Sequence, residues 1–307
     1  MAILHVLDGT AALYRAFHGA GSAQSKDGRE VGAVRGFAQS LSRILRTMRP
    51  SHVAVVFDLT GPTHRHVIDP SYKQNRPPRP PELVAQFDLA RELVDALGMA
   101  QFASPGYEAD DLMATLVWRA RKARVRSILI SPDKDVLQLL SPWVRVVEPK
   151  QLTWVDAAMV EERFGVAPQQ LGDLLALAGD PSDGIRGLPG IGPKAASALL
   201  THFGSLAAFL AATDEELASV PVRGAARLAE RRAAGREHLE LSRRLVRLAC
   251  DAPLDPDPKQ LSTLRYRGPR AGAATWLDAL DLPLNLARLR SIVTSSAPAL
   301  SGQARGA

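Results

Sequence analysis

The 307-residue chain contains one cysteine, Cys250, so no disulfide can form within it. It also lacks a run of apolar residues long enough to cross a bilayer. The amino-terminal stretch "MAILHVLDG" has no basic leader and reaches an aspartate at position 8, which argues against a signal peptide. These absences predict a protein of the reducing cytoplasm without a membrane partner.

Acidic residues are in the minority. Lys and Arg number 38 against 32 Asp and Glu, which gives a formal net charge of +6. An excess of positive charge favours an anionic partner, of which nucleic acid is the commonest, although a merely basic soluble protein explains the charge equally well. The length is sufficient for about two domains.

The first region, residues 1–165, alternates short apolar segments with helical patterns. The expected strands are "AILHVLD" (2–8), "HVAVVFD" (52–58), "SILIS" (127–131) and "VRVVEP" (144–149). Residues 32–48 have helical spacing of apolar side chains. This alternation predicts a mostly parallel sheet covered by helices on both faces, with ligands bound beyond the carboxyl ends of the strands.

Two segments have a different character. Residues 63–83 are rich in proline and basic groups and are expected to form a long crossing or mobile segment. Residues 166–290 are predicted to be mostly helical, with one helix over 169–180 and a turn followed by a helix over 187–204. Residues 291–307 are expected to be a disordered tail.

The stretch "GYEADDLMA" (106–114) places Glu108, Asp110 and Asp111 within four positions. Two like charges about 4 Å apart repel by about 1 kcal/mol in water and by about 4 kcal/mol at an effective dielectric near 20. Bound cations would offset this repulsion, and so would the amino terminus of the helix predicted to begin here.

Further acids occupy the ends of other predicted elements: Asp8 and Asp58 at two strand ends, Asp133 and Asp135 after a third strand, and Asp180 and Asp183 in "GDPSDG". If the sheet is parallel, the acids of the first region converge on one rim. Carboxylates on several loops suit Mg²⁺ or Mn²⁺, and two such ions can activate a water and stabilise the leaving oxygen of a phosphodiester. For any single group, helix capping or turn formation is the simpler interpretation.

The stretch "GLPGIGPKAA" is the second informative motif. Gly190 and Gly192 allow a tight turn and close approach to a ligand, and the helix that follows offers free N–H groups to a phosphate beside Lys194. The motif predicts a helix–hairpin–helix that grips duplex DNA through its backbone. The alternative is an ordinary turn between helices.

Together, the motifs "LDGTAALYRAFHG", "VVFD", "YKQNRP", "GYEADDL", "SPDKDVLQLL" and "ALAGDPSDGIRGLPGIGPKAA" resemble those of the 5′ nucleases, in the same order and spacing. This family includes flap endonucleases, free-standing 5′–3′ exonucleases and the 5′ nuclease domain of bacterial DNA polymerase I. The resemblance covers about residues 3–250. It implies a PIN-like α/β domain with a helical arch around residues 63–85, followed by a helix–three-turn–helix element that binds DNA.

The resemblance also implies roles for individual residues. The first metal site would consist of Asp8, Asp58, Glu108, Asp110 and Asp111. The second would consist of Asp133, Asp135 and Asp183, with Asp180 as an outer acid. The residues expected at the scissile phosphate are Tyr72, Lys73 and Arg76 at the arch and Arg15 near the active site. The hairpin at 187–192 would contact DNA and hold a potassium ion through its carbonyls.

Two positions depart from the family pattern. Gly184 replaces the asparagine of the usual "SDN", and Pro193 replaces a common glutamate before the lysine. Neither change removes a metal-binding acid, so activity is expected. The sequence thus predicts a monomeric, metal-dependent 5′–3′ exonuclease and 5′-flap endonuclease of DNA replication and repair, associated with the bacterial nucleoid. The chain has no polymerase region, and its loose carboxyl-terminal tail favours a free-standing enzyme over the alternative, a fragment of a longer polymerase. The alternatives are a non-catalytic DNA-structure-binding relative and a PIN-type ribonuclease.

Overall fold

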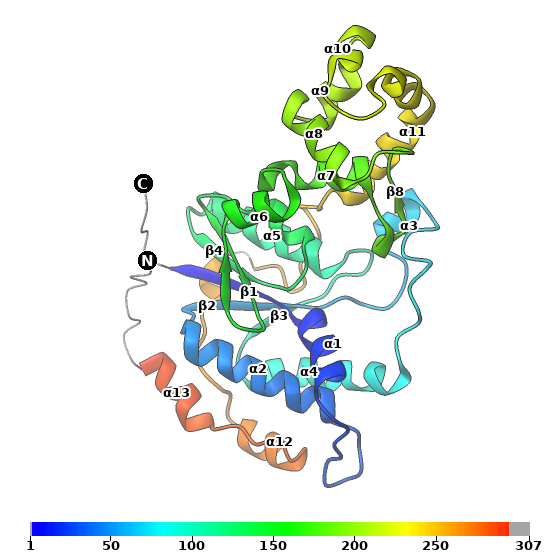
Figure 1. The fold of residues 1–307 in the computed structure, drawn as a ribbon. Helices are drawn as coiled ribbons and strands as arrows, with labels where there is room; N and C mark the ends of the chain where they lie inside the picture. The colour runs from blue at the N-terminus through cyan, green and yellow to red at the C-terminus, as the bar shows by residue number, and fades with distance from the viewer. Residues whose placement is uncertain (1, 259, 295–307) are drawn as a thin grey trace.

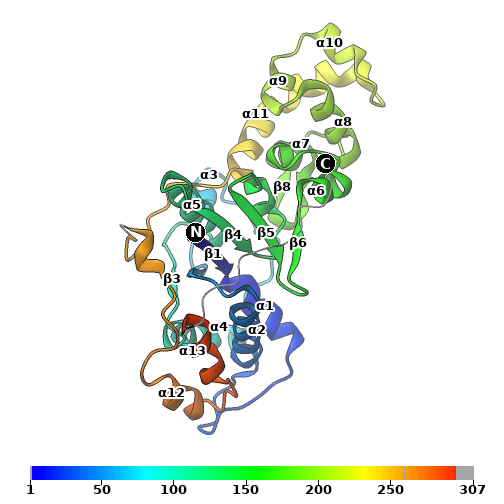
Figure 2. The same ribbon diagram turned by 90° about the vertical axis from the view of Figure 1, so that its left-hand side faces the viewer.

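The computed structural model describes residues 2–258 and 260–294, which form an α/β region and a helical region (Figures 1 and 2). The main sheet has the strand order β3-β2-β1-β4-β5-β6. Its strands are β1 (Ile3–Asp8), β2 (His52–Val56), β3 (Ala100–Phe102), β4 (Arg126–Ile130), β5 (Val144–Glu148) and β6 (Thr153–Val155). All neighbouring pairs are parallel except β5–β6. The parallel sheet confirms the prediction, whereas the short strands β3 and β6 were not expected.

Helices cover both faces of this sheet because its central strands are apolar on both sides. Val53 and Val55 of β2 belong to one apolar cluster, whereas Ala54 and Val56 belong to the other. The first cluster includes residues of α1 (Gly9–Gly19), α2 (Gly32–Met48) and α4 (Pro81–Ala96), and the second includes residues of α5 (Ala109–Lys122). This two-sided burial fixes the strand ends, and with them the acids that follow the strands.

The chain between β2 and α4 crosses the carboxyl edge of the sheet. It contains one short helix, α3 (His64–Ile68), and then turns until α4 begins at Pro81. Lys73 adopts φ +56, which is unusual for a residue other than glycine. The predicted arch is therefore helical only in part, since the prolines of "NRPPRPP" favour turns over a continuing helix.

The helical region stands at one end of the sheet (Figure 1). Its helices are α6 (Ala157–Phe164), α7 (Leu171–Ala178), α8 (Pro193–Phe203), α9 (Leu206–Ala211), α10 (Asp214–Ser219) and α11 (Leu228–Val246). A ribbon of β7 (Gly179–Asp180) and β8 (Ile185–Arg186) joins α7 to the hairpin. The 3₁₀ helices of the chain are η1 (Asp135–Leu139), η2 (Pro168–Gln170), η3 (Pro181–Asp183), η4 (Ala225–Arg227) and η5 (Leu261–Leu264).

The chain then returns to the α/β region, which corrects the predicted extent of the helical domain. Helices α12 (Ala273–Ala279) and α13 (Leu286–Thr294) lie below α2 and α4 in Figure 1. Leu277, Leu289 and Ile292 belong to the same apolar cluster as Leu41 of α2. The second region therefore does not extend as one unit to residue 290.

The predicted tail also needs correction. Its first residues, 291–294, complete α13, whose Ile292 is buried, while residues 295–307 lie outside the described part of the chain. The short helices α12 and α13 were missed because neither is long enough to give a clear helical period. Over residues 2–258 and 260–294, no helix has both the length and the apolarity that a membrane span requires.

Candidate active site

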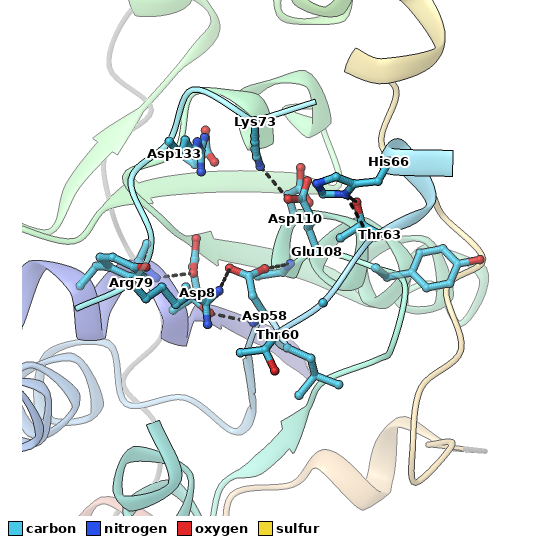
Figure 3. Close-up of a pocket in the computed structure, with 18 of the residues that line it drawn as sticks. Asp8, Asp58, Thr60, Thr63, His66, Lys73, Arg79, Glu108, Asp110 and Asp133 are labelled. Carbon is cyan, nitrogen blue, oxygen red and sulfur yellow. Dashed lines mark hydrogen bonds and ion pairs between the residues drawn. The ribbon is translucent and has the colours of Figure 1, made fainter. Parts of the chain in front are cut away.

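A cavity of about 890 Å³ opens at the carboxyl edge of the sheet (Figure 3). Acids from four parts of the chain line it: Asp8, Asp58, Glu108, Asp110, Asp133 and Asp135. Asp8 ends β1 and caps α1, and Glu108 is the N-cap of α5. The parallel arrangement thus brings together acids that lie up to 127 positions apart in the sequence, as the strand pattern predicts.

Asp8 and Asp58 are neighbouring acids of the cavity, and burial is the largest influence on the pKa of each. Asp8 accepts hydrogen bonds from the Ala11 N–H at 2.8 Å and the Ser131 hydroxyl at 2.9 Å. Burial and the neighbouring Asp58 charge raise the pKa of Asp8 to about 7. Burial also raises the pKa of Asp58, whose Oδ1 accepts the Ala109 N–H at 2.6 Å. A bound cation would favour the charged forms of both acids.

Glu108 has the opposite environment. Its carboxylate accepts hydrogen bonds from Lys73 at 2.7 Å, Arg65 at 2.7 Å and the Tyr72 hydroxyl at 2.9 Å. Burial opposes its ionisation, but the Lys73 and Arg65 charges outweigh that effect and lower the pKa of Glu108. Asp110 is less well compensated: burial raises its pKa well above the usual range, despite Arg65.

Asp111 does not line the cavity. Its side chain is fully buried and makes two hydrogen bonds to the Arg65 guanidinium, at 2.8 and 2.9 Å. The structure therefore separates Asp111 from the cavity acids with which the sequence had grouped it. Arg65 is the functional residue that sequence reasoning missed most clearly, because no local pattern marks a single buried arginine.

A second acid group adjoins the first. Ligand oxygens of Asp135, Asp180 and Asp183 all lie within 4.8 Å of one another. The buried Oδ1 of Asp135 has no hydrogen-bond partner among the described residues, and Lys134 Nζ is 3.8 Å from it. Burial and the Asp133 charge raise the pKa of Asp135 to about 7. An unpartnered carboxylate oxygen among all-oxygen donors fits a hard divalent cation.

Cationic side chains pair with this second group. Lys134 lies 2.7 Å from Asp180, and Asp183 accepts hydrogen bonds from Arg76 and, at 3.0 Å, from the Tyr72 hydroxyl. Burial opposes ionisation of Asp183, but Lys73 and Arg76 outweigh it and lower the pKa of this carboxyl. Sequence reasoning did not assign Lys134, although it lies between Asp133 and Asp135.

Three cationic side chains line the cavity: Lys73, Arg76 and Arg79. Arg79, also missed from the sequence, lies 4.7 Å from the Phe87 ring centroid and 3.9 Å from Asp58. Its place in the basic segment was the only available signal. Arg15 was expected near the site, but it lies outside the cavity lining and pairs with Glu148 at 3.3 Å.

The glycines of the hairpin lie in the helical region, apart from the cavity. Gly190 adopts φ +77 and packs beside the Arg231 guanidinium, whereas Gly192 is extended and precedes α8. Pro193 occupies the first turn of α8, where its missing N–H costs no helical hydrogen bond. Gly184 adopts φ +72, a conformation that asparagine also tolerates, which explains why this departure from "SDN" fits the turn.

Comparison with known proteins adds family evidence. The amino-terminal, resolvase-like domain of 5′–3′ exonucleases matches residues 3–165, and the carboxyl-terminal SAM fold of 5′–3′ exonucleases matches residues 166–270. DNA polymerase I of Rhizobium leguminosarum is 37% identical over 275 residues, which cover 87% of this chain and 26% of that protein. The thermostable DNA polymerase I of Thermus thermophilus is 38% identical over 266 residues, covering 87% and 31%. The chain thus spans about a quarter to a third of these relatives.

Solved structures share the fold. The zinc-bound 5′-exonuclease of T5 has a TM-score of 0.66 at 20% identity and covers 95% of this chain and 97% of its own. The catalytic core of Rad2 in complex with DNA substrate has a TM-score of 0.58 at 15% identity, covering 95% and 92%. At these identities the likeness establishes the architecture of both regions.

Proposed function

Since this chain belongs to the 5′–3′ exonuclease family, we propose that it hydrolyses DNA phosphodiester bonds near free 5′ ends, as a structure-specific exonuclease and flap endonuclease. The observation that carries the proposal is one cavity with acids from four parts of the chain and three cations on its wall. Such a site offers metal ligands and phosphate-binding groups together, which phosphodiester hydrolysis requires.

Two divalent metal ions, Mg²⁺ or Mn²⁺, are the proposed cofactors. Asp8, Asp58, Glu108 and Asp110 would hold the first. Asp133, Asp135 and Asp183 would hold the second, with Asp180 in an outer position. Bound there, the ions would supply charge neutralisation, an activated water and stabilisation of the leaving oxygen. The unpartnered Oδ1 of Asp135 supports this assignment, and so does the report of divalent ions on the T5 5′-exonuclease.

The cationic side chains Lys73 and Arg76 are proposed to bind the phosphate of the substrate when it enters the cavity. Lys73 and Arg76 now pair with Glu108 and Asp183. A phosphate entering the cavity offers them a second anion, so they would hold the scissile group and stabilise its developing charge, with Tyr72 as a hydrogen-bonding neighbour. Arg79, fixed against Phe87, would add a third positive charge from the opposite end of the same segment. Arg15 has no place in this proposal because it pairs with Glu148 away from the cavity.

The hairpin at 187–192 is proposed to hold duplex DNA through its N–H groups, with Lys194 beside it. Its carbonyls are the proposed site for a potassium ion. Two structural relatives have been solved with DNA: the T5 D15 flap endonuclease in a complex with DNA and metal ions, and the Rad2 catalytic core with DNA substrate. The proposed partner is therefore DNA with a 5′ flap, a nick or a free 5′ end.

A direct test incubates the protein with Mg²⁺ and three labelled substrates: a 5′-flap duplex, a nicked duplex and a single-stranded RNA. The proposal expects cleavage of the flap near its junction and release of short products from the nick, with little cleavage of the RNA. Preferential cleavage of RNA would indicate a PIN-type ribonuclease instead. Binding of the flap without any cleavage would indicate a non-catalytic DNA-structure-binding protein.

A further inference from the structure

Asp111 differs from the other acids of the 106–114 cluster because it is fully buried and lies outside the cavity lining. We propose that Asp111 is a positioning residue and not a metal ligand: with Arg65 it forms a buried pair that fixes Glu108 and Asp110 from the side of α11. The inference rests on the proposed function, since it takes Glu108 and Asp110 as ligands of a metal.

The hydrogen bonds of Asp111 leave it no capacity to bind a metal. Its Oδ1 accepts from Arg65 Nη2 at 2.9 Å and from the Ala249 N–H at 2.8 Å. Its Oδ2 accepts from Arg65 Nη1 at 2.8 Å and from the Glu108 N–H at 3.1 Å. A carboxylate offers about four lone-pair sites, and all four are occupied by donors of the chain.

Arg65 is saturated in the same way. The residue is 1% exposed, and its Nε donates to the Leu245 carbonyl at 2.9 Å. Both Nη atoms donate to Asp111, and one of them also donates to Glu108 at 2.7 Å. The other lies 3.4 Å from a carboxylate oxygen of Asp110. The fork geometry of arginine converts these bonds into a fixed spacing between the acids, which the flexible ammonium of lysine would not provide.

The pair also connects the acids to the helical region. Leu245 belongs to the last turn of α11, and Ala249 follows it in the segment that leaves this helix. Arg65 itself lies on α3, beside the carboxyl end of α11 (Figures 1 and 2). The acids at the start of α5 are therefore held from three elements, α3, α5 and the end of α11. A shift of α11 would move the Leu245 carbonyl, which binds Arg65, and the Ala249 N–H, which binds Asp111.

The first test measures Mn²⁺ binding to the full chain without DNA, by electron paramagnetic resonance. Asp111→Asn is expected to bind as many ions as the parent with about tenfold weaker affinity, as for loss of an outer partner. Arg65→Gln should likewise bind as many ions as the parent with a similar loss of affinity. Asp110→Asn, which changes a proposed ligand, should lose one ion. If Asp111→Asn loses one ion and keeps parental affinity for the other, Asp111 is a ligand and the inference is overturned.

The second test measures thermal unfolding in EDTA, where no metal contributes. Asp111→Asn places an amide N–H₂ against donors, so its unfolding temperature should fall, and that of Arg65→Gln should fall as well. Asp110→Asn removes the repulsion of Asp110 by the Glu108 and Asp111 charges, so its unfolding temperature should not fall. An unchanged unfolding temperature for Asp111→Asn would contradict the proposed role of the buried Asp111–Arg65 pair.

Arg119→Gln is the matched control. Arg119 also pairs with an aspartate, Asp257, but at the far end of α5 and near the surface. It should leave both Mn²⁺ binding and unfolding close to the parental values. A parent that bound no Mn²⁺ would overturn the proposed function, whereas the ranking of unfolding temperatures in EDTA decides the role of the pair independently of any metal.

Discussion

The rim of the α/β region and the hairpin of the helical region are proposed to contact the same DNA with different parts of the polypeptide. At the rim the proposed contacts are charged side chains, and burial raises the pKa of two of them, Asp8 and Asp135, to about 7. At the hairpin the proposed contacts are backbone N–H groups next to glycines, and Lys194 would supply the charge. The rim should therefore be sensitive to changes of charge at constant size, and the hairpin to changes of size.

Removal of metal should have the largest effect and should touch only the rim. Because the proposed ligands are carboxylates, excess EDTA is expected to abolish cleavage, while Mg²⁺ or Mn²⁺ restores it. Duplex binding, measured by fluorescence anisotropy in the same buffer, should survive because it rests on phosphate contacts elsewhere. Full cleavage in excess chelator would contradict the metal mechanism.

Asp135→Asn and Asp183→Asn should come next. Each keeps the size of the side chain but weakens a proposed metal ligand, so single-turnover cleavage should fall by orders of magnitude while flap affinity changes little. Glu240→Gln, an exposed acid on α11, provides a control that should cleave at the parental rate. Parental rates in both aspartate variants would show that the second metal site is misassigned.

Lys73→Ala should slow single-turnover cleavage at saturating DNA by about 10²–10³, the usual loss for one preorganised charge. The comparison is Lys26→Ala, since Lys26 is exposed and pairs with Asp278 outside the cavity. If both lysine variants cleave alike, Lys73 only neutralises Glu108.

A hairpin variant should show the opposite behaviour to the rim variants, with weaker DNA affinity and little change in cleavage rate. A Cβ atom at Gly192 would meet no atom within 4 Å other than those of its chain neighbours, so Gly192→Val with Lys194→Ala should fold normally yet displace a phosphate. Affinity for duplex substrates should weaken, and the slope of log affinity against log salt should become shallower by roughly one. Gly190→Val is the poorer choice, because φ +77 would strain its backbone.

For that double variant the cleavage rate of saturated substrate should change much less than its affinity. Binding isotherms at several salt concentrations and a single-turnover rate provide both quantities. Parental affinity and parental salt slope in a folded variant would reduce the hairpin to a turn between helices.

The smallest effect on cleavage is expected from His5, inside β1. Burial lowers the pKa of His5 to about 4, below its usual 6.5. The unfolded chain therefore binds more protons between these values, so the free energy of unfolding should fall as the pH falls from 6.5 to 4. His5→Leu should remove up to about 3 kcal/mol of that fall. Urea unfolding at pH 7, 5.5 and 4 would detect it, and an identical pH dependence in the variant would contradict the assignment.

The sequence predicts well what depends on local order. The helix over 32–48 and the stop of α8 before Gly204 follow from periodicity and glycine, and the family motifs place the cavity acids. Arg65, Arg79 and the α12–α13 return were missed because they depend on contacts between distant segments. The place of Asp111 outside the cavity lining was not predicted for the same reason: its neighbours in sequence line the cavity, but its partner Arg65 lies on another helix.

The return of α12 and α13 to α2 makes the helical region an insertion within the α/β fold. Two covalent connections, before α6 and after α11, join it to the α/β region, so it cannot rotate about a single hinge. A domain tethered twice keeps a nearly constant distance between what it holds and the rim. The fold itself can thus set the distance between the bound duplex and the cleavage position. Lengthening the connection after α11 should broaden the distribution of cleavage positions before it lowers the cleavage rate.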